Sequence, residues 1–421
     1  MKIWIVEVGE PLPLKGSNNR PYRYSQLFDK LSSRGHDVTW WASNFSHQHK
    51  EKIITDTDEI ILDTNKSIRL INMPAYKNNL SIMRVVSQAI TGFRFYRIIR
   101  NENPPDLIVS AYPVMEMAFF SVFFSYKKRI PVIVDVQDLW PDIFLGVKNS
   151  FKKMLVSTFI YPFRLLAKYT FRNASGIVGV SKDYMEFGLK YSDRNIADND
   201  AIFPLAYAKD NNISVIGSVQ ECIDSNKTIV WFVGSFGTTY DLSTVIKTAS
   251  NFETKGIEDV VFVITGDGDS FSTIKNESHG LKNVILTGWL SAPQINYIGE
   301  NASIGLMTYS EGAPQGLPNK VIEYMSFGLP MVCSLTGESQ ELIADNGIGY
   351  QYIAGDVDSL HDCVAKLLDE KLRKPMSKKA QQLFEAGYSP EIVYDKYCNY
   401  IESFSSSSLP QSGLDQIVKR K

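Results

Sequence analysis

The feature that most constrains the fold is an alternation of short apolar runs with helical patterns. Apolar runs of strand length occupy residues 3–8, 36–41, 107–111 and 132–136, and an amphipathic helical pattern covers residues 22–34 between the first two. Strands that alternate with helices pair in parallel and build a doubly wound sheet. We therefore predict the α/β fold class.

The same alternation starts again in the second half of the chain. Apolar runs at 229–234, 260–266, 283–287 and 303–308 follow a polar, irregular stretch. At 421 residues the chain is long enough for two domains. We predict a Rossmann-like domain over residues 1–206 and a second over 207–385. A helix over 386–404 is expected to cross back to the first domain, and a Ser-rich flexible tail covers 405–421.

Composition excludes several classes of protein. The net charge is only −2, which gives no global field for nucleic acid. The four cysteines lie far apart without a CxxC pair, and His47 and His49 lack supporting carboxylates, so we expect no metal site and no disulfide framework. The first residues resemble a buried strand and not a signal peptide, and no apolar run reaches the ~20 residues of a spanning helix. We therefore expect a cytoplasmic protein.

Residues 311–330 carry the strongest sign of chemistry. A loop rich in Gly and Pro follows an apolar strand and leads into a helix from about Pro318. The N–H groups and dipole at such a helix start attract an anion such as a phosphate. Lys320 lies in the first turn, where a bound diphosphate would remove its conflict with the dipole, and Glu323 could accept hydrogen bonds from ribose hydroxyls. A capped surface helix with an incidental lysine is the alternative.

The extended pattern resembles the C-terminal signature of family 4 retaining glycosyltransferases of the GT-B fold. That signature has a Glu-x7-Glu element and then a small residue-x-Gly-x-Pro ending. Glu323 matches the second Glu, and Ser326, Gly328 and Pro330 match the ending, whereas Gln315 stands at the position of the first Glu. The resemblance implies two Rossmann-like domains with parallel sheets that face a cleft, the first of which binds the acceptor and the second the nucleotide-sugar. In the family the first Glu lies near the donor sugar. Gln315 replaces this charged side chain with a neutral one, so the identity of the transferred sugar stays open.

Further segments resemble the same family in the same order. Residues 232–237, 263–268 and 283–290 resemble its strand-to-turn segments, although residues 235–241 lack the Arg and Lys that many members use to hold the donor diphosphate. Lys320 and the amides of 316–319 are therefore expected to replace them. The resemblance implies that the residues contacting the donor are Gly16, Arg20, Gly234, Gly266, Trp289, Gln315, Gly316, Leu317, Asn319, Lys320 and Glu323. Arg23 is a further candidate phosphate contact. A solvated loop with polar residues at a helix start explains Gly16, Arg20 and Arg23 equally well.

The catalytic residues implied by the resemblance are Asp138, Lys320 and Glu323. Many relatives have a His-Asp pair after a buried strand of the first domain, but this chain has Gln137 at the His position. Gln cannot take up a proton, so Asp138 is expected to orient or deprotonate the acceptor hydroxyl. A capping role explains Asp138 equally well. The leaving diphosphate is the alternative proton acceptor, and no cofactor or essential metal is expected beside the nucleotide-sugar donor.

Basic and aromatic residues in the first predicted domain indicate contact with a membrane. Basic residues mix with aromatic residues and leucines over 148–172, with smaller groups at 93–97 and 127–129. Together with a resemblance to subgroups that build bacterial O-antigen or capsule, such as N-acetylfucosamine transferases, this predicts a peripheral enzyme on the anionic inner face of the cell membrane. Its donor is then a UDP-sugar and its acceptor a polyprenyl-diphosphate-linked saccharide. Buried helices with polar edges explain the same residues.

Two other functions remain open at the level of sequence. A UDP-sugar 2-epimerase uses the same fold and nucleotide pocket, although it needs acid/base groups in the cleft. A two-lobed sugar-binding protein without catalysis is the third reading, although such modules are usually exported. Incubation with a UDP-sugar and no acceptor yields an epimer only if the protein is an epimerase. Binding of UDP to the isolated second half favours either enzyme over the sugar-binding protein.

Overall fold

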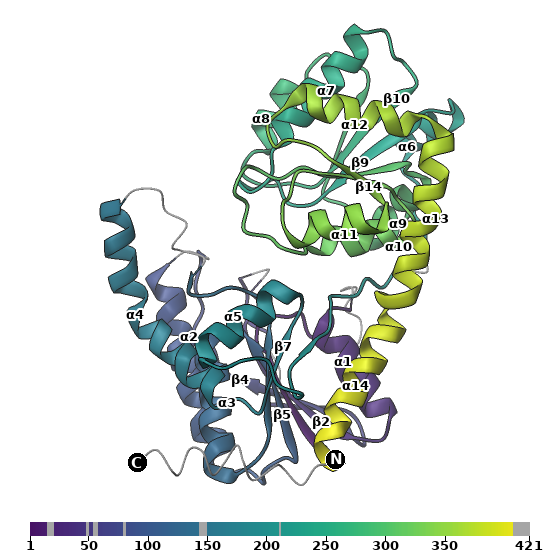
Figure 1. The fold of residues 1–421 in the computed structure, drawn as a ribbon. Coiled ribbons are helices and arrows are strands. Elements are labelled where there is room, and N and C mark those ends of the chain that lie inside the picture. The colour runs from purple at the N-terminus through teal and green to yellow at the C-terminus, as the bar shows by residue number, and fades with distance from the viewer. Residues whose placement is uncertain are drawn as a thin grey trace. The chain divides into compact units, whose positions relative to one another are not determined.

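The computed structural model describes residues 1–14, 21–47, 50–53, 58–78, 81–142, 150–209 and 212–406. The chain forms two compact units. Unit 1 comprises Met1–Pro204 and the chain from Val393 onward, and unit 2 comprises Leu205–Ile392. Each unit is an α/β layer structure around its own sheet (Figure 1), so the predicted fold class is confirmed.

The sheet of unit 1 has the strand order β3-β4-β2-β1-β5-β6-β7-β8. Its strands are β1 (Lys2–Val6), β2 (Asp37–Ser43), β3 (Glu59–Asp63), β4 (Lys66–Ile71), β5 (Leu107–Tyr112), β6 (Val132–Val136), β7 (Gly176–Gly179) and β8 (Ala201–Ile202). Every neighbouring pair is parallel except β3 and β4, which form an antiparallel hairpin at one edge. The central strands are buried on both faces, which explains their uninterrupted apolar sequences.

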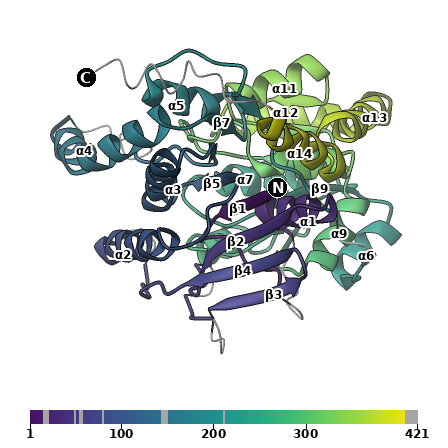
Figure 2. The same cartoon turned by 90° about the horizontal axis from the view of Figure 1, so that it is seen from below.

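Three long helices cover one face of this sheet (Figures 1 and 2). They are α2 (Ile82–Ile99), α3 (Met115–Lys128) and α4 (Ser150–Arg172), and α3 packs against both of the others. The remaining helices of unit 1 are α1 (Arg23–Ser33), α5 (Lys182–Ser192) and α14 (Pro390–Ser406), whose first residues belong to unit 2. α14 lies beside α1, where Asp395 forms ion pairs with Lys30 and Arg34.

A buried charge network fixes α14 to unit 1. The Arg23 guanidinium donates to both oxygens of Asp135 at 2.8 and 3.1 Å, and the Tyr397 hydroxyl donates to the same carboxylate at 2.9 Å. Phe203 stacks on the Tyr397 ring with 4.5 Å between centroids. The guanidinium of Arg23 also donates to the carbonyls of Phe203 and Pro204, so its donors are used inside unit 1 and not on its surface.

The sheet of unit 2 is parallel throughout, in the order β11-β10-β9-β12-β13-β14. Its strands are β9 (Thr228–Val233), β10 (Val260–Thr265), β11 (Val284–Gly288), β12 (Ile304–Met307), β13 (Met331–Cys333) and β14 (Gly349–Gln351). Its helices are α6 (Gly217–Asp224), α7 (Leu242–Thr254), α8 (Phe271–Glu277), α9 (Ala292–Asn301), α10 (Asn319–Ser326), α11 (Glu338–Asn346), α12 (Val357–Leu368) and α13 (Glu370–Gly387). Two apolar clusters fill the space on the two faces of this sheet.

The helices of the described part of the chain include none that is both long and apolar enough to cross a membrane. Within the same described residues, no group of three or more His, Cys, Asp or Glu side chains is placed to hold a metal ion.

Candidate functional site

Helix α10 begins at the carboxyl edge of the unit 2 sheet without a side-chain cap. The loop after β12 reaches Pro318, which precedes the helix and offers no side-chain acceptor to its first turn. The first turn also contains no acidic residue. Nothing in the helix itself therefore offsets the positive end of its dipole, which favours an anion at this position.

Lys320 turns its ammonium group back into unit 2. Its side chain is buried, with only 6% of the residue exposed, and Nζ lies 3.1 Å from the Tyr240 hydroxyl oxygen. Nζ also lies 4.2 Å from the centroid of the Tyr240 ring and 4.8 Å from that of Phe232. Among the described residues no carboxylate forms an ion pair with it. Two aromatic faces and one hydroxyl compensate the charge only in part, so the site favours an added anion.

Two glycines allow the backbone to pack closely around this ammonium group. A Cβ atom at Gly234 would lie 2.2 Å from Nζ of Lys320, and one at Gly266 would lie 1.8 Å from the carbonyl oxygen of Gly234. Both glycines have positive φ angles, +154° and +138°, and Gly234 N–H donates to Thr265 O at 3.0 Å. The ends of β9 and β10 can approach each other this closely only without side chains. The carboxyl ends of parallel strands are where open α/β sheets bind ligands.

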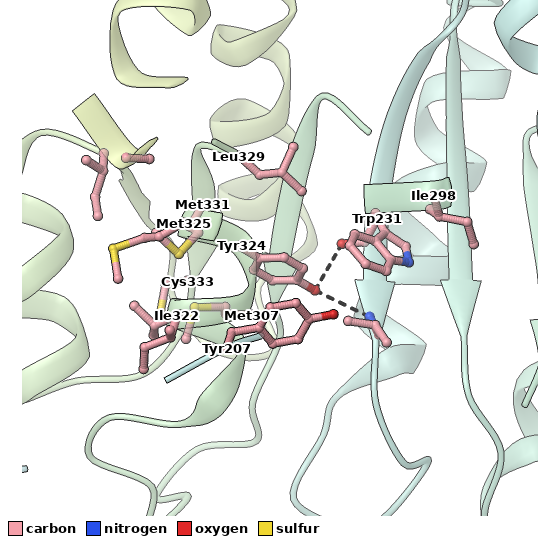
Figure 3. Close-up of a cluster of buried hydrophobic side chains, with 14 of the residues drawn as sticks. Tyr207, Trp231, Ile298, Met307, Ile322, Tyr324, Met325, Leu329, Met331 and Cys333 are labelled. Atoms are coloured by element: carbon pink, nitrogen blue, oxygen red, sulfur yellow. Dashed lines mark hydrogen bonds between the residues drawn. The ribbon is translucent and has the colours of Figure 1, made fainter. Parts of the chain in front are cut away.

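Tyr324 holds α10 against the sheet, one turn beyond Lys320. Its hydroxyl oxygen accepts the N–H of Val233 at 3.3 Å and lies within 3.2 Å of the carbonyls of Trp231 and Leu306 (Figure 3). The ring packs edge-on against Trp231 in the core. Because residues i and i+4 share a face of a helix, this anchor also directs Lys320 toward the end of β9.

The loop before α10 is tied to the start of α11. The carbonyl of Gly316 accepts hydrogen bonds from both the backbone N–H and the hydroxyl of Ser339. Leu317 is buried in the core, whereas Asn319 is exposed. Gln315 is half-buried, and its Oε1 has no hydrogen-bond partner among the described residues. A buried amide oxygen without a partner is costly, so a ligand hydroxyl or water is expected there.

The remaining residues predicted to contact the donor are Glu323, Trp289, Gly16 and Arg20. Glu323 is buried on the second turn of α10, at 8% exposure. Trp289 is 78% exposed and follows Gly288, whose carbonyl accepts the Gly266 N–H at 3.0 Å. The Gly266 turn therefore connects Trp289 to the Gly234–Lys320 cluster. Gly16 and Arg20 lie outside the described residues.

Unit 1 contains a cavity of about 170 Å³ that sequence analysis missed. Its walls combine apolar side chains with five polar ones; the lining residues are Glu7, Val8, Gly9, Phe45, His47, Met73, Tyr76, Arg84, Gln88, Pro113 and Val114. Burial raises the pKa of Glu7 to about 7 and lowers that of His47 to about 4. His47 forms a short hydrogen bond with the Tyr76 hydroxyl. The sequence indicates this cavity only through the position of Glu7 directly after the first strand.

Asp138 follows β6 but does not line this cavity. Its carboxylate accepts the N–H of Leu139 at 2.7 Å, and burial raises its pKa above the ordinary value of an aspartate. The guanidinium of Arg84 lies 5.3 Å from the ring of Trp140, two residues further along. A raised pKa makes the Asp138 carboxylate a better proton acceptor than an ordinary aspartate.

Solved structures share this architecture over nearly the whole chain. Sucrose-phosphate synthase from Thermosynechococcus elongatus superposes with a TM-score of 0.67 at 15% identity, covering 96% of this chain and 100% of that one. WaaG, a glycosyltransferase involved in lipopolysaccharide biosynthesis, gives 0.63 at 14% identity over 94% and 99%. Anabaena HepE in complex with UDP and glucose gives 0.62 at 14% identity over 96% and 100%. The chain has the GT-B fold.

The GT-B assignment agrees with two sequence comparisons. Residues 218–383 match the sequence model of the family described as glycosyl transferases group 1, a match that lies within unit 2. The Escherichia coli enzyme UDP-Gal:alpha-D-GlcNAc-diphosphoundecaprenol alpha-1,3-galactosyltransferase is 26% identical over 144 residues. That match covers 33% of this chain and 36% of the relative. These findings support the predicted family, whereas the N-acetylfucosamine subgroup stays a prediction.

Proposed function

We propose that this GT-B protein is a retaining glycosyltransferase that moves a sugar from a UDP-sugar to a lipid-linked saccharide in the synthesis of a bacterial surface polysaccharide, such as O-antigen or capsule. The observation that carries the proposal is the buried Lys320 ammonium group beside the Gly234 turn and the uncapped start of α10. The ammonium group packs against the Gly234 turn and its residue belongs to the first turn of α10, so a nucleotide diphosphate would supply the missing negative charge.

We assign the donor roles on the basis of this arrangement. Lys320 and the backbone N–H groups of Gly316, Leu317 and Asn319 hold the diphosphate, and Glu323 accepts hydrogen bonds from the ribose. Trp289, exposed at the end of β11, offers a ring to the base. The half-buried amide oxygen of Gln315 accepts a hydroxyl of the transferred sugar. Gly16 and Arg20, outside the described residues, remain proposed contacts of the phosphates and sugar.

The proposed reaction breaks one bond and forms one bond on the same face of the sugar. The acceptor oxygen attacks the anomeric carbon, and the bond from that carbon to the diphosphate oxygen breaks. The acceptor proton passes to the leaving diphosphate or to Asp138. Lys320 and the helix amides stabilise the negative charge that develops on the leaving group. No further cofactor or metal is proposed for this step.

The cavity of unit 1 is the proposed site of the acceptor saccharide. Its polar groups, with Glu7, Arg84 and Gln88 among them, can hydrogen-bond sugar hydroxyls while Phe45 and Tyr76 supply apolar faces. The E. coli relative is named for an acceptor linked to diphosphoundecaprenol. By analogy we propose a polyprenyl-diphosphate-linked acceptor for this protein, which then works at the anionic inner face of the cell membrane.

Mass spectrometry of a lipid-linked acceptor incubated with UDP-, GDP- and TDP-sugars tests this function. We expect one UDP-sugar to give a product whose mass increases by one sugar residue, and proton NMR of that product should show that the anomeric configuration of the donor is retained. An inverted product contradicts the mechanism, and no product with any donor contradicts the activity. The same incubation without acceptor separates an epimerase, since only an epimerase converts the UDP-sugar to its epimer.

A further inference from the structure

We propose that the outer face of helix α2 binds the surface of an anionic lipid bilayer. The proposal rests on the lipid-linked acceptor of the proposed function and names the surface that would meet the membrane. The α2 face is defined by five exposed apolar residues: Ile82, Met83, Val86, Ile90 and Phe93. Their exposed fractions range from 37% to 75%, and they recur at helical spacing over three turns.

The exposure of the α2 face is unusual for a helix that packs on a sheet. A surface helix normally turns its apolar stripe inward and its polar residues outward. Here the buried side of α2 carries four small or polar residues and two large apolar ones, which are Ser87, Gln88, Thr91, Gly92, Phe95 and Ile99. Large apolar side chains that point outward in a row indicate a partner with an apolar interior.

The charges on and around α2 identify the partner as anionic. The helix contains Arg84, Arg94 and Arg97 and no acidic residue. Among the described residues, neither Arg94 nor Arg97 forms an ion pair with a carboxylate. Lys127 at the end of α3 lies against this helix, with its Nζ 3.5 Å from the Tyr96 hydroxyl. A helix with apolar residues over its first turns and arginines over its last suits lipid tails and negative headgroups together.

Helix α4, which the sequence favours as the membrane surface, carries five basic residues and no acidic one. It also exposes apolar rings, such as Phe159 and Tyr161. However, Arg164 pairs with Asp142 at 2.9 Å and Arg172 pairs with Asp193 at 2.6 Å, so internal carboxylates neutralise two of its cations. Residues of α2, and no described residue of α4, line the unit 1 cavity, so α2 is the primary contact and α4, on the other side of α3 (Figure 2), is a secondary one.

The position of α2 connects the membrane to the acceptor cavity. Arg84 and Gln88 of this helix line the unit 1 cavity, and Ile82, Met83 and Val86 beside them are exposed. The two surfaces are thus separated by no more than the thickness of one helix, about 10 Å with side chains. A lipid-linked saccharide can keep its chain in the bilayer at the α2 face while its sugar enters the cavity.

Flotation of the full chain with lipid vesicles tests this surface. One vesicle contains phosphatidylglycerol and phosphatidylcholine in equal parts, and the other contains phosphatidylcholine alone. We expect at least tenfold stronger partition to the anionic vesicles. Arg97→Gln should weaken that partition about fivefold, and Ile82→Ser about tenfold. Ile61→Ser is the matched control, because Ile61 on β3 is as exposed as Ile82, 74% against 75%, but lies on another part of unit 1.

Three outcomes would overturn the α2 surface. The first is equal partition to both vesicles, and the second is an effect of Ile61→Ser as large as that of Ile82→Ser. The third is light scattering that shows a dimer which Ile82→Ser dissociates, since the face would then join two copies of the chain. Transfer to a detergent-dispersed acceptor separates this result from the proposed function. The α2 variants should keep wild-type transfer rates there, whereas loss of transfer in every protein would refute the function and leave vesicle binding unaffected.

Discussion

Substitution of Lys320 by Met should separate ligand affinity from stability. Met has a similar length and fills the space between Phe232 and Tyr240, but it removes the ammonium group that lies 3.1 Å from the Tyr240 hydroxyl. In the free protein a buried cation without a carboxylate partner adds little net stability, since its desolvation offsets its contacts with the rings. We therefore expect the free energy of unfolding to change by less than about 1 kcal/mol.

The loss of affinity should be much larger than the change in stability. A charge-assisted hydrogen bond to a phosphate is worth about 1.5–3 kcal/mol, which corresponds to a Kd for UDP about 10- to 150-fold higher. Uridine lacks the diphosphate, so its weaker binding should be unchanged. Lys247→Met is the matched control, because Lys247 is an exposed lysine on α7 of the same unit.

Isothermal titration calorimetry with UDP and uridine, combined with thermal unfolding without ligand, gives all three quantities. The reasoning fails if Lys320→Met binds UDP within twofold of the wild type. It also fails if uridine binding falls as much as UDP binding, because the substitution would then have damaged the pocket and not removed a phosphate contact.

Three further predictions concern stability. Gly266→Ala should destabilise unit 2 by about 3 kcal/mol or more, because its Cβ would lie 1.8 Å from a carbonyl oxygen. The control Gly280→Ala, whose Cβ would have nothing within 4 Å, should cost only about 1 kcal/mol. Denaturant unfolding measures both changes in the free energy of unfolding. Tyr397→Phe should cost about 1–3 kcal/mol by the same measurement, since Asp135 loses a buried donor, and an unchanged midpoint would contradict the role of this network. Burial and the nearby Glu7 raise the pKa of Glu10 from 4.5 to about 8, so the folded protein holds a proton that the unfolded chain releases; this stabilisation is complete below about pH 4.5 and is lost as the pH rises through about 8. The melting temperature should therefore fall by several degrees between pH 6 and pH 9, and Glu10→Gln should reduce that fall.

Local patterns were enough to predict the central strands of each sheet and the glycines that follow them. Strands β9 and β10 are buried on both faces, and Gly234 and Gly266 stand where the sequence places the ends of these strands. These features depend on residues that are close together in the sequence. The spacing of apolar residues and the positions of Gly and Pro are therefore enough to predict them. The antiparallel β3–β4 hairpin was not predicted, because its strand β3 is half exposed and alternates only weakly.

Contacts between residues that are far apart in the chain could not be predicted from the sequence. Tyr240 lies 80 positions before Lys320, and no pattern indicates that its ring and hydroxyl hold that ammonium group. The cavity of unit 1 is lined from five separate segments of the chain. The sequence offered Arg23 for a phosphate, but the fold gives it Asp135 as a buried partner. The basic and aromatic residues 93–97 do not form one surface, because the Phe93 side chain is exposed whereas that of Phe95 is buried.

The attachment of α14 to unit 1 has a consequence for how the protein is made. Unit 2 is one continuous segment, so it can fold as soon as the ribosome has released it, whereas unit 1 needs residues that follow unit 2 in the chain. Until Tyr397 emerges, the buried Asp135 carboxylate lacks one of its donors and Phe203 lacks its stacking partner. A chain that ends at residue 392 should therefore have a folded unit 2 and a unit 1 that is still open to proteases.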